Sequence, residues 1–190
     1  MRPPVHRRAK GKGLSGARRS HANGSTEGDS PTKRRGLSLH DRALRFLAVR
    51  PRSRREVRDR LRKAGFDPED IEGEIERLEA AGLLDDDRFA RDYAEHLVGN
   101  KGVGRRALAS SLFAKGIDKE TIDAVAGEMG GDEEERAEEL ARSRVSRLSG
   151  LDPAAAHRRL MGFLARRGYD ASVCRRAASK ALEVSDQGFR

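Results

Sequence analysis

The sequence has little of what builds one large core, a disulfide framework or a membrane span. Aromatic residues make up 4% and hydrophobic residues 36% of the 190 residues, whereas 37% are charged. Such a chain buries several small cores more readily than a single large one. One cysteine, Cys174, excludes an intramolecular disulfide and suits a reducing compartment. No apolar run approaches the ~20 residues of a membrane span, and the N-terminus lacks the apolar core of a signal peptide. We therefore expect a cytoplasmic protein that has no membrane contact.

The residue patterns of common enzyme sites are also missing. The five histidines are scattered, and neither an H-E-x-x-H motif nor a cysteine pair is present to bind a metal ion. The glycine-rich stretch 99–104 lacks P-loop spacing and follows no strand, so we interpret it as a flexible turn between helices. The acidic run 85–87 could hold Mg²⁺ for a nuclease, but it equally suits a helix start. We expect no enzyme activity, no metal site and no cofactor.

One seven-residue segment, here called the joint, occurs three times. Its copies, which begin 51 and 52 residues apart, are Leu61–Asp67, Leu112–Asp118 and Leu164–Asp170. Each copy combines a basic helix end, a glycine that can adopt positive φ, an apolar residue and an aspartate that can cap the next helix. Four residues beyond each aspartate stands a side chain fit for a core: Ile71, Ile122 and Cys174. This repetition predicts a small array of similar helical modules.

Helix-start patterns divide the chain further. Ser38 and the capping-box pattern Ser53-x-x-Glu56 predict two helix starts, and proline follows an aspartate at Pro68 and Pro153. Apolar and polar residues never alternate with a period of two, so no strand is predicted. The predicted fold is all-α: three tandem three-helix modules in an elongated, curved array after a disordered tail. The predicted divisions are 1–37 (basic tail), 38–84, 85–131 and 132–184 (modules one to three) and 185–190 (C-terminal end).

Most of the net charge of +9 lies in the first 37 residues. This segment contains ten lysines and arginines against Glu27 and Asp29 and is rich in glycine and serine. It has hardly any large apolar residues, so burial cannot offset the entropy lost on ordering. Two functions are open for the tail: a solubilising extension, or a non-specific electrostatic arm for nucleic acid.

Outside the tail, positive charge concentrates in the second helix of each module. For one helix this pattern usually means only a solvated face, but three equivalent helices of the same sign favour a surface that binds a phosphate backbone or an acidic protein groove. We call these residues the basic stripe: Arg54, Arg55, Arg58, Arg62, Lys63, Lys101, Arg105, Arg106, Lys115, Arg158, Arg159, Arg166 and Arg167. Aromatic residues at periodic or joint positions are expected to be mostly core: Phe66, Phe89, Tyr93, Phe113, Phe163 and Tyr169.

As a set, these segments resemble the RecX family of recombinase regulators over residues 38–184. The resemblance is carried by the joint 61–67 with Ile71, by Gly82-Leu83-Leu84-Asp85-Asp86 with Arg88-Phe89-Ala90 and Tyr93, and by Lys115-Gly116-Ile117-Asp118. It does not extend to the basic tail. The family has no catalytic motif, so the candidate binding residues rest on charge alone.

The resemblance implies a curved all-helical protein that binds RecA and the RecA–DNA filament along the filament groove. We expect the protein to act as a monomer. It also implies inhibition or modulation of the ATPase, strand-exchange and coprotease activities of RecA, and thus regulation of DNA repair, recombination and the SOS response. Direct nucleic-acid binding is expected to be weak and independent of sequence. The alternative is a plain DNA- or RNA-binding protein that acts through its tail and helix pairs without RecA.

Overall fold

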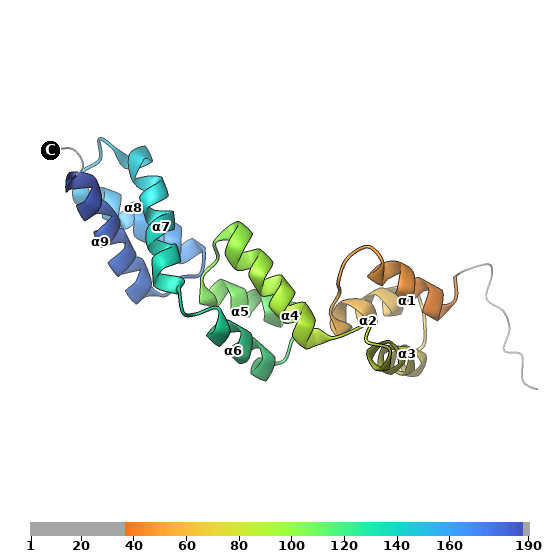
Figure 1. Ribbon diagram of the computed structural model, residues 1–190. Helices are drawn as coiled ribbons and strands as arrows, with labels where there is room; N and C mark the ends of the chain where they lie inside the picture. Colours follow the sequence, from red (N-terminus) through yellow and green to blue (C-terminus); the bar gives the residue numbers. More distant parts are fainter. Residues whose placement is uncertain (1–36, 188–190) are drawn as a thin grey trace, which may run out of the picture. The chain divides into compact units, whose positions relative to one another are not determined.

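The computed structural model describes residues 37–187, which contain helices and turns but no strand (Figure 1). The all-α prediction is thereby confirmed. The α-helices of this region are α1 (Leu39–Leu47), α2 (Arg54–Lys63), α3 (Pro68–Ala80), α4 (Asp86–Glu95), α5 (Arg105–Ala114), α6 (Lys119–Glu128), α7 (Glu133–Val145), α8 (Pro153–Arg166) and α9 (Ala171–Gln187). A π-helix, η1 (His96–Asn100), extends α4, and a 3-10 turn, η2 (Ser146–Leu148), extends α7. None of the described helices is long and apolar enough to cross a bilayer. The predicted tail lies outside the described residues except for Leu37.

Side-chain caps start the helices where the sequence predicts them. The Ser38 side chain accepts a hydrogen bond from the Asp41 N–H at the start of α1. At α2, Ser53 and Glu56 form the complete capping box, in which each side chain accepts from the other residue's backbone N–H. Asp152 caps α8, with Pro153 as its first helical residue, where no N–H is needed within the helix. These predictions of helix starts are confirmed.

The three joints close their helices in the same way. In the first joint the glycine N–H donates to the Arg62 carbonyl, and the next N–H donates to the Leu61 carbonyl. This pair of bonds is the Schellman motif, which satisfies the last carbonyls of a helix and needs a residue at positive φ. The other two joints repeat both bonds, and the glycines have φ values of 86°, 84° and 85° at Gly65, Gly116 and Gly168. The predicted turn is therefore confirmed in all three copies.

Three separate apolar clusters form the core of the described residues. The largest fully buried side chains include Leu61 and Ile75 in the first cluster, Leu108 and Leu112 in the second, and Tyr169 in the third. Each cluster draws on one set of three consecutive α-helices, α1–α3, α4–α6 or α7–α9. The array is thus built from small cores, as the low apolar content of the chain requires.

The third cluster is packed mainly by small side chains. Its buried alanines are contributed by α7 and α9, namely Ala137, Ala141, Ala177, Ala178 and Ala181. Cys174 lies among them with 1% of its surface exposed, and burial raises the pKa of its thiol. The thiol is therefore packed, as predicted from its position after the third joint.

The glycine-rich stretch 99–104 does not begin with a break, so the turn predicted from Gly99 is wrong in its first half. The helix continues through η1 to Asn100, and only Gly102 adopts positive φ, at 55°. The third module stabilises this end. The Arg167 guanidinium donates to the Lys101 carbonyl, and the Tyr169 hydroxyl donates to the Gly102 carbonyl at 3.3 Å. A contact across 66 residues of sequence thus overrides the local preference of glycine.

Candidate functional site

The amino end of α2 contacts the carboxyl end of α5. The Ser53 hydroxyl donates to the Lys115 carbonyl at 2.7 Å, and the Arg54 N–H donates to the Asp86 carboxylate at 2.8 Å. Asp86 is half-buried, and this burial raises its pKa even though the bond from Arg54 favours the charged form. The first module is therefore attached to the second through polar groups at a helix start, which otherwise lack partners.

The amino end of α5 contacts the carboxyl end of α8 in the same manner. The Gly104 N–H donates to the Arg167 carbonyl at 2.8 Å, and the Arg106 N–H donates to the Gly168 carbonyl at 3.1 Å. The Arg105 N–H donates to the Glu133 carboxylate at 2.8 Å. Glu133 is the first residue of α7, as Asp86 is of α4. The two inter-module junctions therefore share one design.

Glycine makes the second junction possible. A Cβ at Gly168 would lie 2.4 Å from both the backbone nitrogen and the Cβ of Ala107, and a Cβ at Gly104 would lie 2.5 Å from the Tyr169 nitrogen. By contrast, a Cβ at Gly65 in the first joint would meet nothing within 4 Å. The joint thus serves two purposes: all three copies end a helix, and the second and third copies also receive the preceding module.

These junctions bring the three basic helices α2, α5 and α8 into end-to-end contact. The acidic residues of the neighbouring helices nevertheless offset part of the charge in module one. The Arg58 guanidinium donates to both carboxylate oxygens of Glu72 at 2.6 and 2.7 Å, and Arg54 lies 2.7 Å from Glu79. The hydrogen bonds between Arg58 and Glu72 raise the pKa of Arg58 and lower the pKa of Glu72. Arg54 and Arg58 therefore stabilise the α2–α3 packing.

Another ion pair lies at the first junction. The Lys115 ammonium lies 2.7 Å from Glu56, which also accepts a hydrogen bond from Arg50 at 2.9 Å. Burial acts to raise the pKa of Glu56, but the bonds from Arg50 and Lys115 outweigh it and lower the pKa. Arg55 and Arg62 both lie beside Asp59, at 3.9 and 3.8 Å. Lys115 is thus a junction residue as well as a member of the basic stripe.

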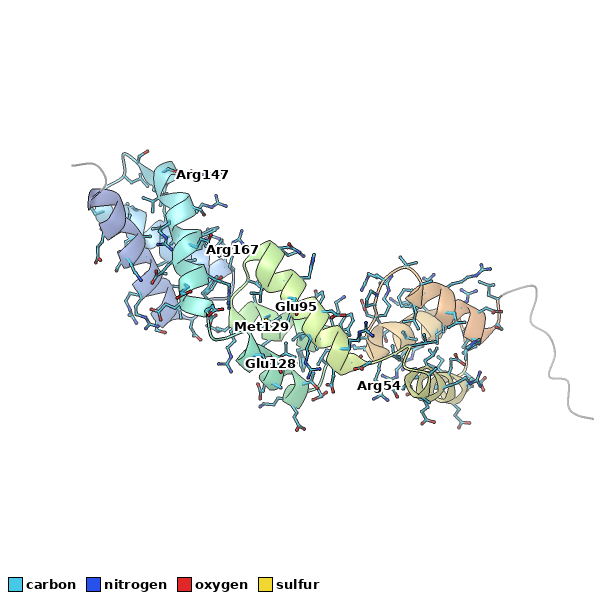
Figure 2. The ribbon with its side chains drawn as sticks, viewed as in Figure 1. Arg54, Glu95, Glu128, Met129, Arg147 and Arg167 are labelled. Atoms are coloured by element: carbon cyan, nitrogen blue, oxygen red, sulfur yellow. The ribbon has the colours of Figure 1, made fainter. Side chains whose placement is uncertain are left out.

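The stripe residues of module three are placed differently. Among the described residues, no ion pair involves Arg158, Arg159 or Arg166. All three line an open groove of about 700 Å³ between α8 and the end of α7. Arg144 and Arg147 line the same groove, and Figure 2 labels Arg147 at its place after α7. We call these five residues the arginine groove.

Sequence reasoning missed Arg144 and Arg147 because it considered only the second helix of each module. The acidic-to-basic charge gradient along α7 was the sequence feature that could have indicated them. The remaining stripe residues lie at exposed positions or near the second junction: Lys63, Lys101, Arg105, Arg106 and Arg167.

One aromatic residue departs from the expected core role. Phe113 is 71% exposed on α5, so the expectation that aromatic residues are mostly core does not hold there. Phe89, by contrast, is 5% exposed and stacks on Tyr93 with ring centroids 5.6 Å apart. The Phe163 ring lies under the guanidinium groups of Arg144 and Arg167, at 4.5 and 4.9 Å from its centroid.

Of the described residues, no group of three or more His, Cys, Asp or Glu side chains is arranged to hold a metal ion.

The fold and the surface define an all-α protein of three tandem three-helix modules whose second helices are basic. Three family models match the chain: the RecX first, second and third three-helix domains, over residues 40–78, 85–125 and 132–178. The crystal structure of RecX from Lactobacillus salivarius has the same fold, with a TM-score of 0.69 at 21% identity, over 75% of this chain and 94% of that chain.

Curated relatives agree with these matches. The Regulatory protein RecX of Amycolatopsis mediterranei (strain U-32) is 39% identical over 140 residues, which cover 73% of this chain and 80% of the relative. The Regulatory protein RecX of Mycobacterium avium (strain 104) is 42% identical over 133 residues, which cover 68% of this chain and 76% of the relative. The chain therefore belongs to the RecX family of regulatory proteins, a family of non-enzymatic regulators. The resemblance noted in the sequence is confirmed.

Proposed function

We propose that this chain binds the RecA–DNA filament in the cytoplasm and inhibits or modulates the ATPase, strand-exchange and coprotease activities of RecA. The chain acts as a monomer. Through its action on RecA it regulates DNA repair and recombination. Its membership of the RecX family supports the choice of partner. In this proposal the basic stripe supplies much of the attraction to the filament.

The observation that carries the proposal is the pair of matching junctions. Each joins the start of one basic helix to the end of the next, through Ser53 and Lys115 in one case and Gly104 and Arg167 in the other. The three basic helices therefore follow one another end to end. Such a repeat suits a partner that itself presents repeated anionic sites, because linked weak contacts reinforce one another.

The test is ATP hydrolysis by RecA on single-stranded DNA, with and without the full chain. One exposed, unpaired cation of each second helix is reversed together: Lys63→Glu, Arg106→Glu and Arg159→Glu. None of the three takes part in an ion pair of the described residues, so the helices should keep their packing. Single exposed charges contribute only ~0–1 kcal/mol, so the triple change should weaken inhibition far more than any single change.

A matched control reverses Arg45, Arg142 and Arg175, which are exposed cations of α1, α7 and α9. Its net charge equals that of the first variant, and circular dichroism checks the helicity of both. The proposal requires the wild-type chain and the control to suppress hydrolysis when the second-helix variant does not. Suppression by all three proteins at equal concentration would place the contact surface elsewhere. The alternative of a plain nucleic-acid binder predicts strong binding to bare DNA and no response that requires RecA.

A further inference from the structure

The arginine groove gathers positive charge from two segments of module three. Five arginines from two different segments, α8 and the end of α7 with η2, face one open depression of about 700 Å³. Its lining includes no aspartate or glutamate. Like charges gathered without counter-charges repel one another, so an anion that enters the groove gains attraction from several guanidinium groups at once.

The stripe residues of α2 near α3, and Lys115 at the first junction, differ from the groove in this respect. In module one, Arg54 and Arg58 already bind Glu79 and Glu72, and Lys115 binds Glu56 at the first junction. In the arginine groove, Arg158, Arg159 and Arg166 take part in no ion pair of the described residues. A ligand therefore does not have to displace an internal carboxylate there. We expect the groove to dominate the binding of anions by this chain.

The groove also has an apolar floor, which bears on the class of its ligand. Leu148, Leu160 and Phe163 line it beside the arginines. Two guanidinium groups, of Arg144 and Arg167, already lie over the Phe163 ring, so this ring is not a free platform for a nucleobase. The cations are all arginines, whose planar forks match the two oxygens of a carboxylate as well as those of a phosphate, so the apolar lining and not the arginines favours a polypeptide.

We propose that the arginine groove binds an acidic polypeptide segment that also carries an apolar side chain. Carboxylates of the segment pair with Arg158, Arg159 and their neighbours, while the apolar side chain contacts the floor near Leu148. The assignment rests on the proposed function in one respect: it makes module three a contact to the protein component of the filament rather than to its DNA.

The test measures fluorescence anisotropy of a short labelled peptide of glutamate and aspartate with a central leucine, added to the full-length chain. Reversal of Arg158 and Arg159 to Glu should weaken binding by about tenfold or more, because charge-assisted bonds become repulsive. The matched control reverses Arg142 and Arg175, which lie outside the groove. Its affinity should stay within about twofold of the wild-type value, since screening weakens distant charges.

Two further arms separate the peptide from other polyanions. Replacing the leucine of the peptide by serine should weaken binding, and an unlabelled oligothymidylate of equal charge should compete less well than the unlabelled peptide. Equal affinity of the groove variant and the control would overturn the assignment. It would also be overturned if the oligonucleotide displaced the peptide more readily than the peptide itself did.

The variant Arg158→Gln with Arg159→Gln keeps the test valid if charge reversal disturbs the fold, because it removes the charge and retains most of the side-chain volume. The peptide assay contains no RecA, so its outcome is independent of the proposed function. A wild-type chain that leaves RecA hydrolysis unchanged would refute the proposed function while peptide binding persisted. Loss of ATPase suppression in the control but not in the groove variant would instead contradict the role of the groove.

Discussion

Alanine at Gly168 should destabilise the protein more than alanine at Gly65. Both glycines have nearly the same φ, 85° and 86°, so alanine pays the same left-handed backbone strain at each. This strain is about 1–2 kcal/mol, and the lower entropy of the unfolded chain offsets about 0.4–1 kcal/mol of it. The net cost at Gly65 is therefore about 0–1.6 kcal/mol, with no further term because its Cβ would enter open space.

At Gly168 the new Cβ would also collide with the backbone of α5, 2.4 Å from the Ala107 nitrogen. Overpacking of this kind adds about 1–3 kcal/mol. For a chain of this length each kcal/mol lowers the melting temperature by roughly 2–4 °C. Thermal unfolding followed by circular dichroism should therefore show a loss of a few degrees for Gly65→Ala and at least twice that loss for Gly168→Ala.

Asparagine separates the two causes, because it tolerates the left-handed conformation better than alanine. Gly65→Asn should be close to wild type, whereas Gly168→Asn should remain strongly destabilised because the collision with Ala107 persists. Equal losses for the two alanine variants, or recovery of Gly168→Asn, would refute the view that the third joint receives α5.

Three other outcomes are expected. The pKa values of Glu56 and Glu72 are lowered in the folded chain, so their contribution to the free energy of unfolding is present above about pH 4.3 and is lost as the pH falls through the folded values. Urea titrations of the Glu72→Gln variant should therefore show a smaller loss of unfolding free energy between pH 5 and pH 3 than the wild type shows. An acid profile equal to that of the wild type would contradict this. A chain that starts at Leu37 should melt within a degree or so of the full chain, since Ser38 caps the first helix; a drop of many degrees would show that the tail supports the fold. Direct binding to single-stranded DNA should weaken with salt with a log–log slope near −3.5, for roughly 5 neutralised phosphates; a binding constant insensitive to salt would contradict a backbone contact.

Local features of the sequence predict most of the fold. The capping box at Ser53 and the three joints depend on residues within about seven positions of one another, and each forms as predicted. The η1 extension could not be predicted in this way, because the carbonyls just beyond its end, of Lys101 and Gly102, accept hydrogen bonds from Arg167 and Tyr169 of another module. Gly99 indicated a break in the helix, whereas η1 continues past it and hydrogen-bond donors of a distant segment stabilise the helix end.

The charge pattern predicts the candidate site only in part. Counting charges along a helix finds Arg58 but cannot show that Glu72, 14 residues away, binds it with two hydrogen bonds. The same count omits Arg144, because that residue reaches the groove from a different helix. Net charge is readable from sequence, whereas the charge available to a partner depends on which acidic side chains the fold brings near.

Pro153 has a consequence for assembly. The junctions between modules are heterologous, since a helix start meets a helix end, and a contact of this type can continue from one molecule to the next into an open polymer. Both junctions use the N–H of the first residue of the second helix, Arg54 in α2 and Arg105 in α5. The corresponding residue of α8 is Pro153, which has no N–H to donate. A further copy that presented its own joint to α8 could not form this bond, so an end-to-end contact at α8 would have one hydrogen bond fewer than either junction within the chain.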